Sequence, residues 1–352
     1  MKKTYLSLLF FLLILPGCKE SAPAKLEIGP HEFAREETGT FSRLGLEDIP
    51  LKIPYKQFPY ESYLILFGRF DDHFVEIYDK SSGALVTTGV KQGRGPGEIV
   101  HSLFADFNPG TGTLTVVDDR GRKILAFDTD ELIAGNVRFT KQELPSNWCD
   151  QIFQLDESHW LLSNMVSKTA LTGPADRFTI DRTDSTRIAV YNRFPVEKDP
   201  ENQNMVIYQQ RRSSLSPDRT KLAIATRMRR FFFETYHIRK KGITPLSMRM
   251  IGGSVDLTQG WPEEKRTDAV TSLYAADDFV IASVVNPGSE TESKTYNCIA
   301  VFDWQGNALK RIRFDGYKSI EAPCLDQDGR TLYAVAETEN GYHYLVSAQI
   351  DL

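Results

Sequence analysis

The sequence is poor in cysteine, in long apolar runs and in positive charge. Its 352 residues include four cysteines, too few for a disulfide-rich scaffold. It has one long apolar run, near its start, which excludes a protein with several membrane-spanning helices. Lys and Arg number 42 against 47 Asp and Glu, and the net charge of −5 argues against a general nucleic-acid binder. The hydrophobic content of 41% is sufficient for a globular core.

The motifs of several common enzyme classes are also missing. The sequence has no Gly-x-Ser-x-Gly elbow, no phosphate-binding loop and no closely spaced histidine pair. The cysteines Cys149, Cys298 and Cys324 match no zinc spacing. Paired acids such as Asp277-Asp278 fall at predicted turns, where carboxylates commonly accept backbone N–H groups. We therefore expect no catalytic group, no metal and no cofactor.

The first residues predict export and a lipid anchor. Tyr5–Leu15 is almost wholly apolar but shorter than the ~20 residues of a membrane-spanning helix, as in a secretory signal peptide. Leu15-Pro16-Gly17-Cys18 resembles the lipobox of bacterial lipoproteins, apart from its proline. The resemblance implies that residues 1–17 are removed and that Cys18 carries the lipid. Residues 18–30 then form a flexible tether, rich in small residues and proline.

The remainder, residues 31–352, shows the pattern of a repeated all-β unit. Runs of β-branched and aromatic residues alternate with Gly, Asp, Asn and Pro, and the one helix-like fragment is Asp130–Leu132. Second strands of successive units are predicted to begin at Tyr63, Thr113, Trp160, Lys221, Phe279 and Thr331. This repeat of about fifty residues predicts a β-propeller with four-stranded antiparallel blades. Six blades fit the spacing best, and seven are the alternative.

The last unit ends after its third strand, at Leu352. A propeller must close its ring to leave no bare edge. We therefore expect residues 31–55, which include Leu44–Ile53, to supply the missing outer strand. The outer strands of the third unit cannot be placed from the sequence, and insertions are expected at 165–176 and 196–205.

Two motifs carry a resemblance to a known family. Lys91–Ile99 contains Gly-x-Gly-Pro-Gly-Glu, and Leu215–Ala223 contains Ser-Pro-Asp followed by Arg219 where glycine is usual. Together they resemble the six-bladed, TolB-like β-propeller lipoproteins of Gram-negative bacteria. The resemblance implies a propeller fold and an envelope location, but little about chemistry. Together with the lipobox, it leads us to expect a lipoprotein of the outer membrane, on the periplasmic side or the cell surface.

Candidate ligand-binding residues lie in two loops expected at one channel mouth. Arg94 and Glu98 belong to the glycine-rich loop, although Glu98 can equally hold that loop together by accepting backbone N–H groups. Arg211, Arg227 and Arg229 are expected near the same mouth. Guanidinium groups suit carboxylate, phosphate or sulfate ligands.

The sequence thus predicts a non-catalytic binding protein of the cell envelope. Its partner would be a glycan, above all an anionic one, a peptide or an envelope protein, with lipid as the sole membrane contact and no nucleic acid. The alternative is an envelope enzyme, a lactonase, glycosidase or lyase, with its site in the central channel. A structural subunit of an envelope complex is a third possibility.

Overall fold

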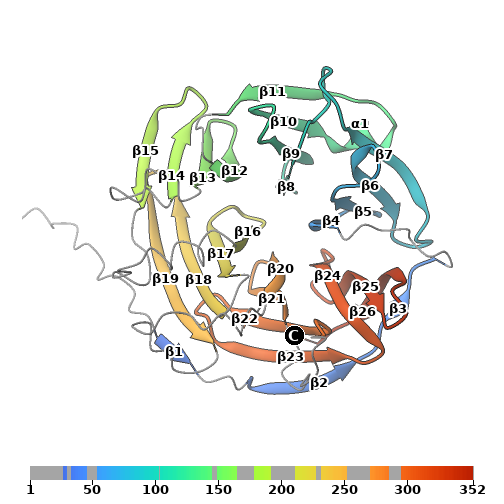
Figure 1. Cartoon of the computed structure of the whole chain (residues 1–352). Coiled ribbons are helices and arrows are strands. Elements are labelled where there is room, and N and C mark those ends of the chain that lie inside the picture. Colours follow the sequence, from blue (N-terminus) through green and yellow to red (C-terminus); the bar gives the residue numbers. More distant parts are fainter. Residues whose placement is uncertain are drawn as a thin grey trace, which may run out of the picture.

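The structure, a computed structural model of the 352-residue chain, is a six-bladed β-propeller (Figure 1). It describes residues 27–29, 33–45, 54–102, 104–144, 149–164, 178–191, 211–226, 231–251, 270–284 and 295–351. Within these ranges, no helix has the length and apolar character needed to cross a bilayer.

Each blade is an antiparallel sheet of four strands, which follow one another from the central channel to the outer rim. Blade 1 comprises β4 (Lys56–Tyr60), β5 (Tyr63–Phe67), β6 (His73–Asp79) and β7 (Leu85–Lys91). Blade 2 comprises β8 (Ala105–Asn108), β9 (Thr113–Asp118), β10 (Lys123–Asp128) and β11 (Phe139–Glu143), with helix α1 (Thr129–Ile133) before its last strand. Blade 3 comprises β12 (Cys149–Asp156), β13 (His159–Asn164), β14 (Phe178–Arg182) and β15 (Arg187–Tyr191). Blade 4 comprises β16 (Arg211–Leu215), β17 (Lys221–Thr226), β18 (Phe231–Arg239) and β19 (Gly242–Ile251). Blade 5 comprises β20 (Val270–Ala275), β21 (Phe279–Val284), β22 (Cys298–Asp303) and β23 (Ala308–Phe314). Blade 6 comprises β24 (Tyr317–Leu325), β25 (Thr331–Thr338), β26 (His343–Gln349) and β3 (Ser42–Arg43).

The N-terminal segment forms a strap along the outer rim of blades 4, 5 and 6. Strand β1 (Glu27–Gly29) pairs in parallel with β19, and β2 (Arg35–Gly39) pairs in parallel with β23. Strand β3 completes blade 6 by antiparallel pairing with β26. In Figure 1, β1 and β2 therefore lie outside β19 and β23, on the outer rim of the ring. The expected closure by residues 31–55 is confirmed, although the strand that closes the last blade is just two residues long.

Aromatic side chains hold the strap against the blades. The ring of Phe41 stacks on Phe314 of blade 5 with 3.9 Å between centroids, and Phe33 meets Phe302 at 5.7 Å. A Cβ at Gly39 would approach the Phe314 ring to 2.5 Å, so the strap fits this close only because a glycine faces the ring. The glycine and the two rings thus fix the strap's position.

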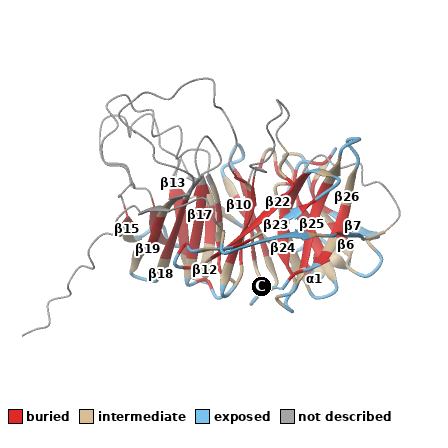
Figure 2. Ribbon diagram, turned by 90° about the horizontal axis from the view of Figure 1, so that it is seen from below, coloured by how far each residue is buried: buried red, intermediate tan, exposed pale blue. Residues whose placement is uncertain are grey.

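Apolar faces of neighbouring blades pack together and form the core, which Figure 2 shows as red strands between paler loops. Between blades 3 and 4, for example, the buried rings of Phe178 and Tyr236 meet edge to face at 5.5 Å. The observed strands begin within one residue of all six predicted second-strand starts, and α1 contains the predicted helical fragment. The six-bladed prediction is confirmed over the seven-bladed alternative. The predicted insertions at 165–176 and 196–205 lie outside the described residues.

Candidate functional site

A cavity of about 300 Å³ opens at one mouth of the central channel. The ends of the inner strands of blades 1, 2, 4, 5 and 6 build its wall, together with the turns that lead to their second strands. Its lining combines a large apolar part with a few charged groups, which is typical of small-molecule sites. The apolar part includes Phe58, Phe107, Leu215, Tyr274, Phe279 and Leu325. The charged groups are Lys56, Asp106, Asp277, Asp278 and Asp326.

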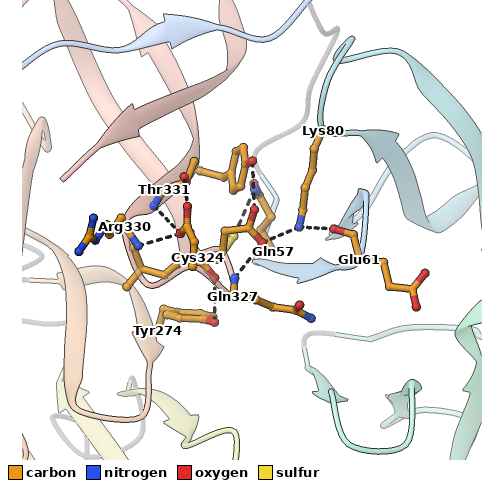
Figure 3. A network of polar contacts seen from close by, with 12 residues as sticks. Gln57, Glu61, Lys80, Tyr274, Cys324, Gln327, Arg330 and Thr331 are labelled. Carbon is orange, nitrogen blue, oxygen red and sulfur yellow. Dashed lines mark hydrogen bonds and ion pairs between the residues drawn. The ribbon is translucent and has the colours of Figure 1, made fainter. Parts of the chain in front are cut away.

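The blade 6 wall of this cavity is a fixed polar network (Figure 3). Lys80 donates from Nζ to the Glu61 carbonyl and to Asp326 Oδ1, both at 2.6 Å. Tyr274 donates to the carbonyl of Leu325 at 3.2 Å, and burial raises the pKa of its phenol. Asp326 is thus neutralised by Lys80, and this wall is set before any ligand arrives.

Arg219 occupies a backbone conformation that normally belongs to glycine. Its φ is +62°, in the left-handed region, and its N–H donates to the Ser216 carbonyl. In the matching turn of blade 6, the N–H of Gly329 donates to the Asp326 carbonyl in the same way, and its φ is +66°. A left-handed conformation costs roughly 1–2 kcal/mol for a residue with a Cβ. The blade 4 turn therefore retains an arginine in spite of local strain.

The arginine side chain reaches two blades away. Its Nη1 donates to Asp106 Oδ2 at 2.7 Å, and its Nη2 donates to the Phe107 carbonyl at 2.6 Å. Both side chains of this ion pair are about 8% exposed. A buried, hydrogen-bonded pair of this kind neutralises Asp106 and fixes the floor of the cavity.

Lys56 is the one cation among these charged lining groups, and it has no ion-pair partner among the described residues. Its Nζ lies 4.3 Å from the centroid of the Phe104 ring and 5.5 Å from that of Phe153. No hydrogen bond or ion pair joins the ammonium to the part of the chain that the structure describes. Burial lowers the pKa of Lys56 to about 8, and the nearby guanidinium groups of Arg212 and Arg219 contribute to this lowering while Asp106 opposes it. The channel thus holds a desolvated amine with capacity for a ligand.

Two exposed acids, Asp277 and Asp278, line the cavity at its blade 5 rim. Asp277 and Asp278 belong to the turn between β20 and β21, and the Asp277 carbonyl accepts Lys221 Nζ at 2.5 Å and Trp304 Nε1 at 2.9 Å. These bonds fix the backbone of the turn. Neither carboxylate has an ion-pair partner among the residues described. The rim therefore presents two carboxylates to the cavity, and the Lys221 ammonium is bonded to the backbone of the same turn.

The structure places the glycine-rich loop at the other end of the inner strands. This loop, residues 91–99, precedes β8, whereas the cavity lies where β8 ends. Glu98 accepts the Gly95 N–H at 2.7 Å within its own loop, and Lys123 Nζ donates to the Glu98 carbonyl at 2.6 Å. Arg94 is exposed, and no polar contact joins it to the described residues. The observed contacts of Glu98 hold the loop and blade 2 together.

The other residues proposed from sequence fall outside the described part of the structure. Arg211 lies in β16, but its side chain is not among those described, and Arg227, Arg229 and Cys18 lie outside the described ranges entirely. Blade 4 nevertheless brings guanidinium groups to the channel, through Arg212 and Arg219. Over the described ranges, no three His, Cys, Asp or Glu side chains converge in a metal-binding arrangement.

Sequence reasoning missed Lys56 and Asp106 and gave Arg219 no role. The signal for Arg219 was present, since an arginine replaces glycine in a turn that needs a positive φ. A signal for Lys56 was weaker: a lysine at the start of an inner strand whose other residues are uncharged.

Comparisons with known proteins support the fold. No family model and no curated protein match the chain. A Bacteroides fragilis crystal structure, described as a candidate exported protein, is 13% identical with a TM-score of 0.54, covering 92% of this chain and 100% of that one. The WD40 repeats of RRP9 are 10% identical with a TM-score of 0.51, covering 88% and 100%. A duf4221 family member from Bacteroides vulgatus is 9% identical with a TM-score of 0.50, covering 90% and 96%. At such identities these likenesses show the propeller fold alone.

Proposed function

We propose that the protein is a binding propeller of the cell envelope. Its ligand would occupy the cavity at the channel mouth where the inner strands end. The observation that carries the proposal is the charge arrangement of this cavity. Asp106 and Asp326 are paired with Arg219 and Lys80, whereas Lys56 has no such partner among the described residues. A fixed wall with one uncompensated cation favours the recognition of an anionic group.

The envelope location is part of the proposal and is supported by the sequence. The apolar run before Cys18 and the lipobox-like residues around it favour export and lipid attachment at the outer membrane. One similar fold belongs to a protein described as a candidate exported protein.

An enzyme is the second candidate function, and Lys56 is also the observation that favours it. An amine whose pKa is lowered to about 8 is present in part as the neutral base near physiological pH. Such a group is suited to proton abstraction or to attack on a carbonyl. Binding is preferred because the described cavity wall presents no second titratable group hydrogen-bonded to Lys56 that could orient it.

A cavity-filling substitution tests the proposed function. Ala276 lines the cavity, so Ala276→Trp is expected to block it, and Ala276→Ser is the matched control that leaves it open. Full-length wild type and both variants are screened against a glycan array and a library of short peptides. Binding that Ala276→Trp removes and Ala276→Ser retains supports the proposal. Turnover of a bound ligand that depends on Lys56 supports the enzyme, and a set of ligands indifferent to Ala276→Trp contradicts the site.

A further inference from the structure

We infer that this cavity, at the channel mouth where the inner strands end, recognises a small zwitterion. The zwitterion would be a free amino acid or a short peptide. Its carboxylate would contact Lys56 and its ammonium would contact Asp277 and Asp278. The inference deepens the proposed function and rests on it. It assigns a chemical class to the ligand and a partner to each of the ligand's two charges.

The ammonium group of Lys56 can form an ion pair with one ligand carboxylate. Lys56 lines the cavity, and its ammonium contacts only aromatic rings among the described residues. The charged groups nearest to it are already engaged: Asp106 with Arg219, and Arg212, which donates from Nε to the Thr271 carbonyl at 2.6 Å. A ligand carboxylate would therefore add the missing ion pair without displacing an existing one.

The rim excludes a ligand that is strongly anionic. Asp277 and Asp278 are adjacent, exposed and without an ion-pair partner in the described chain, so they repel a sulfate, a phosphate or a polyuronate. The same pair of carboxylates attracts an ammonium group. A cation and a pair of carboxylates that line one cavity are the complement of a zwitterion.

The wall and the volume set the remaining chemistry. Phe58, Tyr274 and Phe279 line the cavity as partly buried rings and Phe107 as a buried one, which suits an apolar side chain between the two charges. A volume of about 300 Å³ is at the lower end of ligand pockets. It accommodates an amino acid or a dipeptide and excludes a folded partner from the interior.

Three matched probes separate the two charges. Titration calorimetry of the full-length protein uses the dipeptide Ala-Phe, its N-acetyl derivative and its C-terminal amide. Ala-Phe is expected to bind most tightly, and the loss of either charge is expected to weaken binding about ten- to hundredfold, the range of a charged hydrogen bond. Equal affinity for all three probes would overturn the inference.

Variants assign each charge to its partner. Lys56→Met is expected to abolish the difference between Ala-Phe and its amide, while the exposed lysine variant Lys91→Met retains it. The double variant Asp277→Asn and Asp278→Asn is expected to abolish the difference between Ala-Phe and its N-acetyl derivative. Glu339→Gln, an exposed acid outside the cavity lining, is its control. Discrimination that survives in the cavity variants would overturn the inference.

The pH dependence of ligand affinity tests Lys56 directly, because a purely structural role of this lysine would not change it. The N-acetyl probe has no amine to titrate, so its affinity is expected to fall about tenfold between pH 7 and pH 9 as Lys56 loses its proton. Lys56→Arg remains charged throughout and is expected to show no such fall. A fall that persists in Lys56→Arg assigns the titration to another group and counts against the inference.

Failure of this inference can be distinguished from failure of the proposed function. If a neutral sugar binds in a manner that Ala276→Trp blocks and all three dipeptide probes do not bind, the cavity is a binding site and the zwitterion assignment is wrong. If no ligand of any class is sensitive to Ala276→Trp, both proposals are wrong.

Discussion

Arg219 of blade 4 and Asp106 of blade 2 form an ion pair, at 2.7 Å, between two blades that are not neighbours in the ring. Its donor is an arginine with a left-handed backbone, at a position where the matching turn of blade 6 has Gly329. The pair therefore ties non-adjacent blades together at the mouth of the channel.

Removal of Arg219 is expected to destabilise the fold by about 2–4 kcal/mol. Arg219→Gly relieves backbone strain but leaves Asp106 buried and unpaired, and breaking one half of a buried pair costs roughly 3–5 kcal/mol. The double variant with Asp106→Asn is expected to recover part of this loss. Urea denaturation of the single and double variants measures the coupling, and purely additive effects would show that the pair is not an energetic unit.

Lys56→Met is expected to stabilise the protein at neutral pH by about 3 kcal/mol. Because the folded state lowers the Lys56 pKa from 10.5 to about 8, the unfolded chain holds this proton more tightly. The penalty is fully present below pH 8 and is relieved as pH rises from about 8 to 10.5. The stability difference between variant and wild type should therefore shrink over this range, with Lys91→Met as the control. A difference that is constant with pH would contradict the assignment.

The strap is expected to be a main contributor to stability. Gly39→Ala forces a Cβ against the Phe314 ring, and Phe41→Ala removes the ring that stacks on Phe314. Phe-to-Ala substitutions in packed positions cost roughly 3–5 kcal/mol, and we expect Phe41→Ala near the lower limit because its partner is at the rim. Thr38→Ala, at an exposed position of the same strand, should change the free energy of unfolding by less than about 0.5 kcal/mol. If thermal denaturation shows that Gly39→Ala and Phe41→Ala destabilise the protein no more than Thr38→Ala does, strand pairing and not side-chain packing holds the strap.

Two variants in the glycine-rich loop are expected to differ in their effect on stability. Glu98→Ala leaves the Gly95 N–H without its acceptor and is expected to cost about 1–3 kcal/mol. Arg94→Ala alters an exposed side chain and should change stability by less than about 0.5 kcal/mol. Chemical denaturation measures both. If Arg94→Ala instead weakens ligand binding while leaving stability unchanged, the second channel mouth is also functional.

The parts of the fold that were predicted correctly have a strong local signal. Second strands such as Lys221–Thr226 are buried apolar runs that follow a turn motif, so their starts are visible in the sequence. Strands β14 and β15 are five residues long each, and no Ser-Pro-Asp turn motif precedes them to mark their starts. Strand β2 is almost wholly polar, Arg-Glu-Glu-Thr-Gly, and exists because an edge of blade 5 supplies its hydrogen-bond partners.

The site was harder to predict because its side chains come from inner strands that are far apart in the sequence. Sequence spacing locates the loops at each end but not the side chains that fill the channel between them. Lys56 is separated from Asp106 by 50 residues and from Arg219 by 163, and only ring closure brings the three groups to one cavity. A single charged residue in a strand, such as Lys56, can be assigned to a site only when its neighbours in space are known.

The strap also affects the order in which strands pair during folding. Its Glu36 pairs with Arg311, a residue 275 positions later in the chain. During synthesis from the N-terminus, this first segment must wait, unpaired, until blades 4 to 6 have been made. Contacts of such sequence separation form late and slowly, so an exposed edge of blade 5 persists until the end of folding. The strongly charged strand β2 is therefore also one that can stay soluble while it waits.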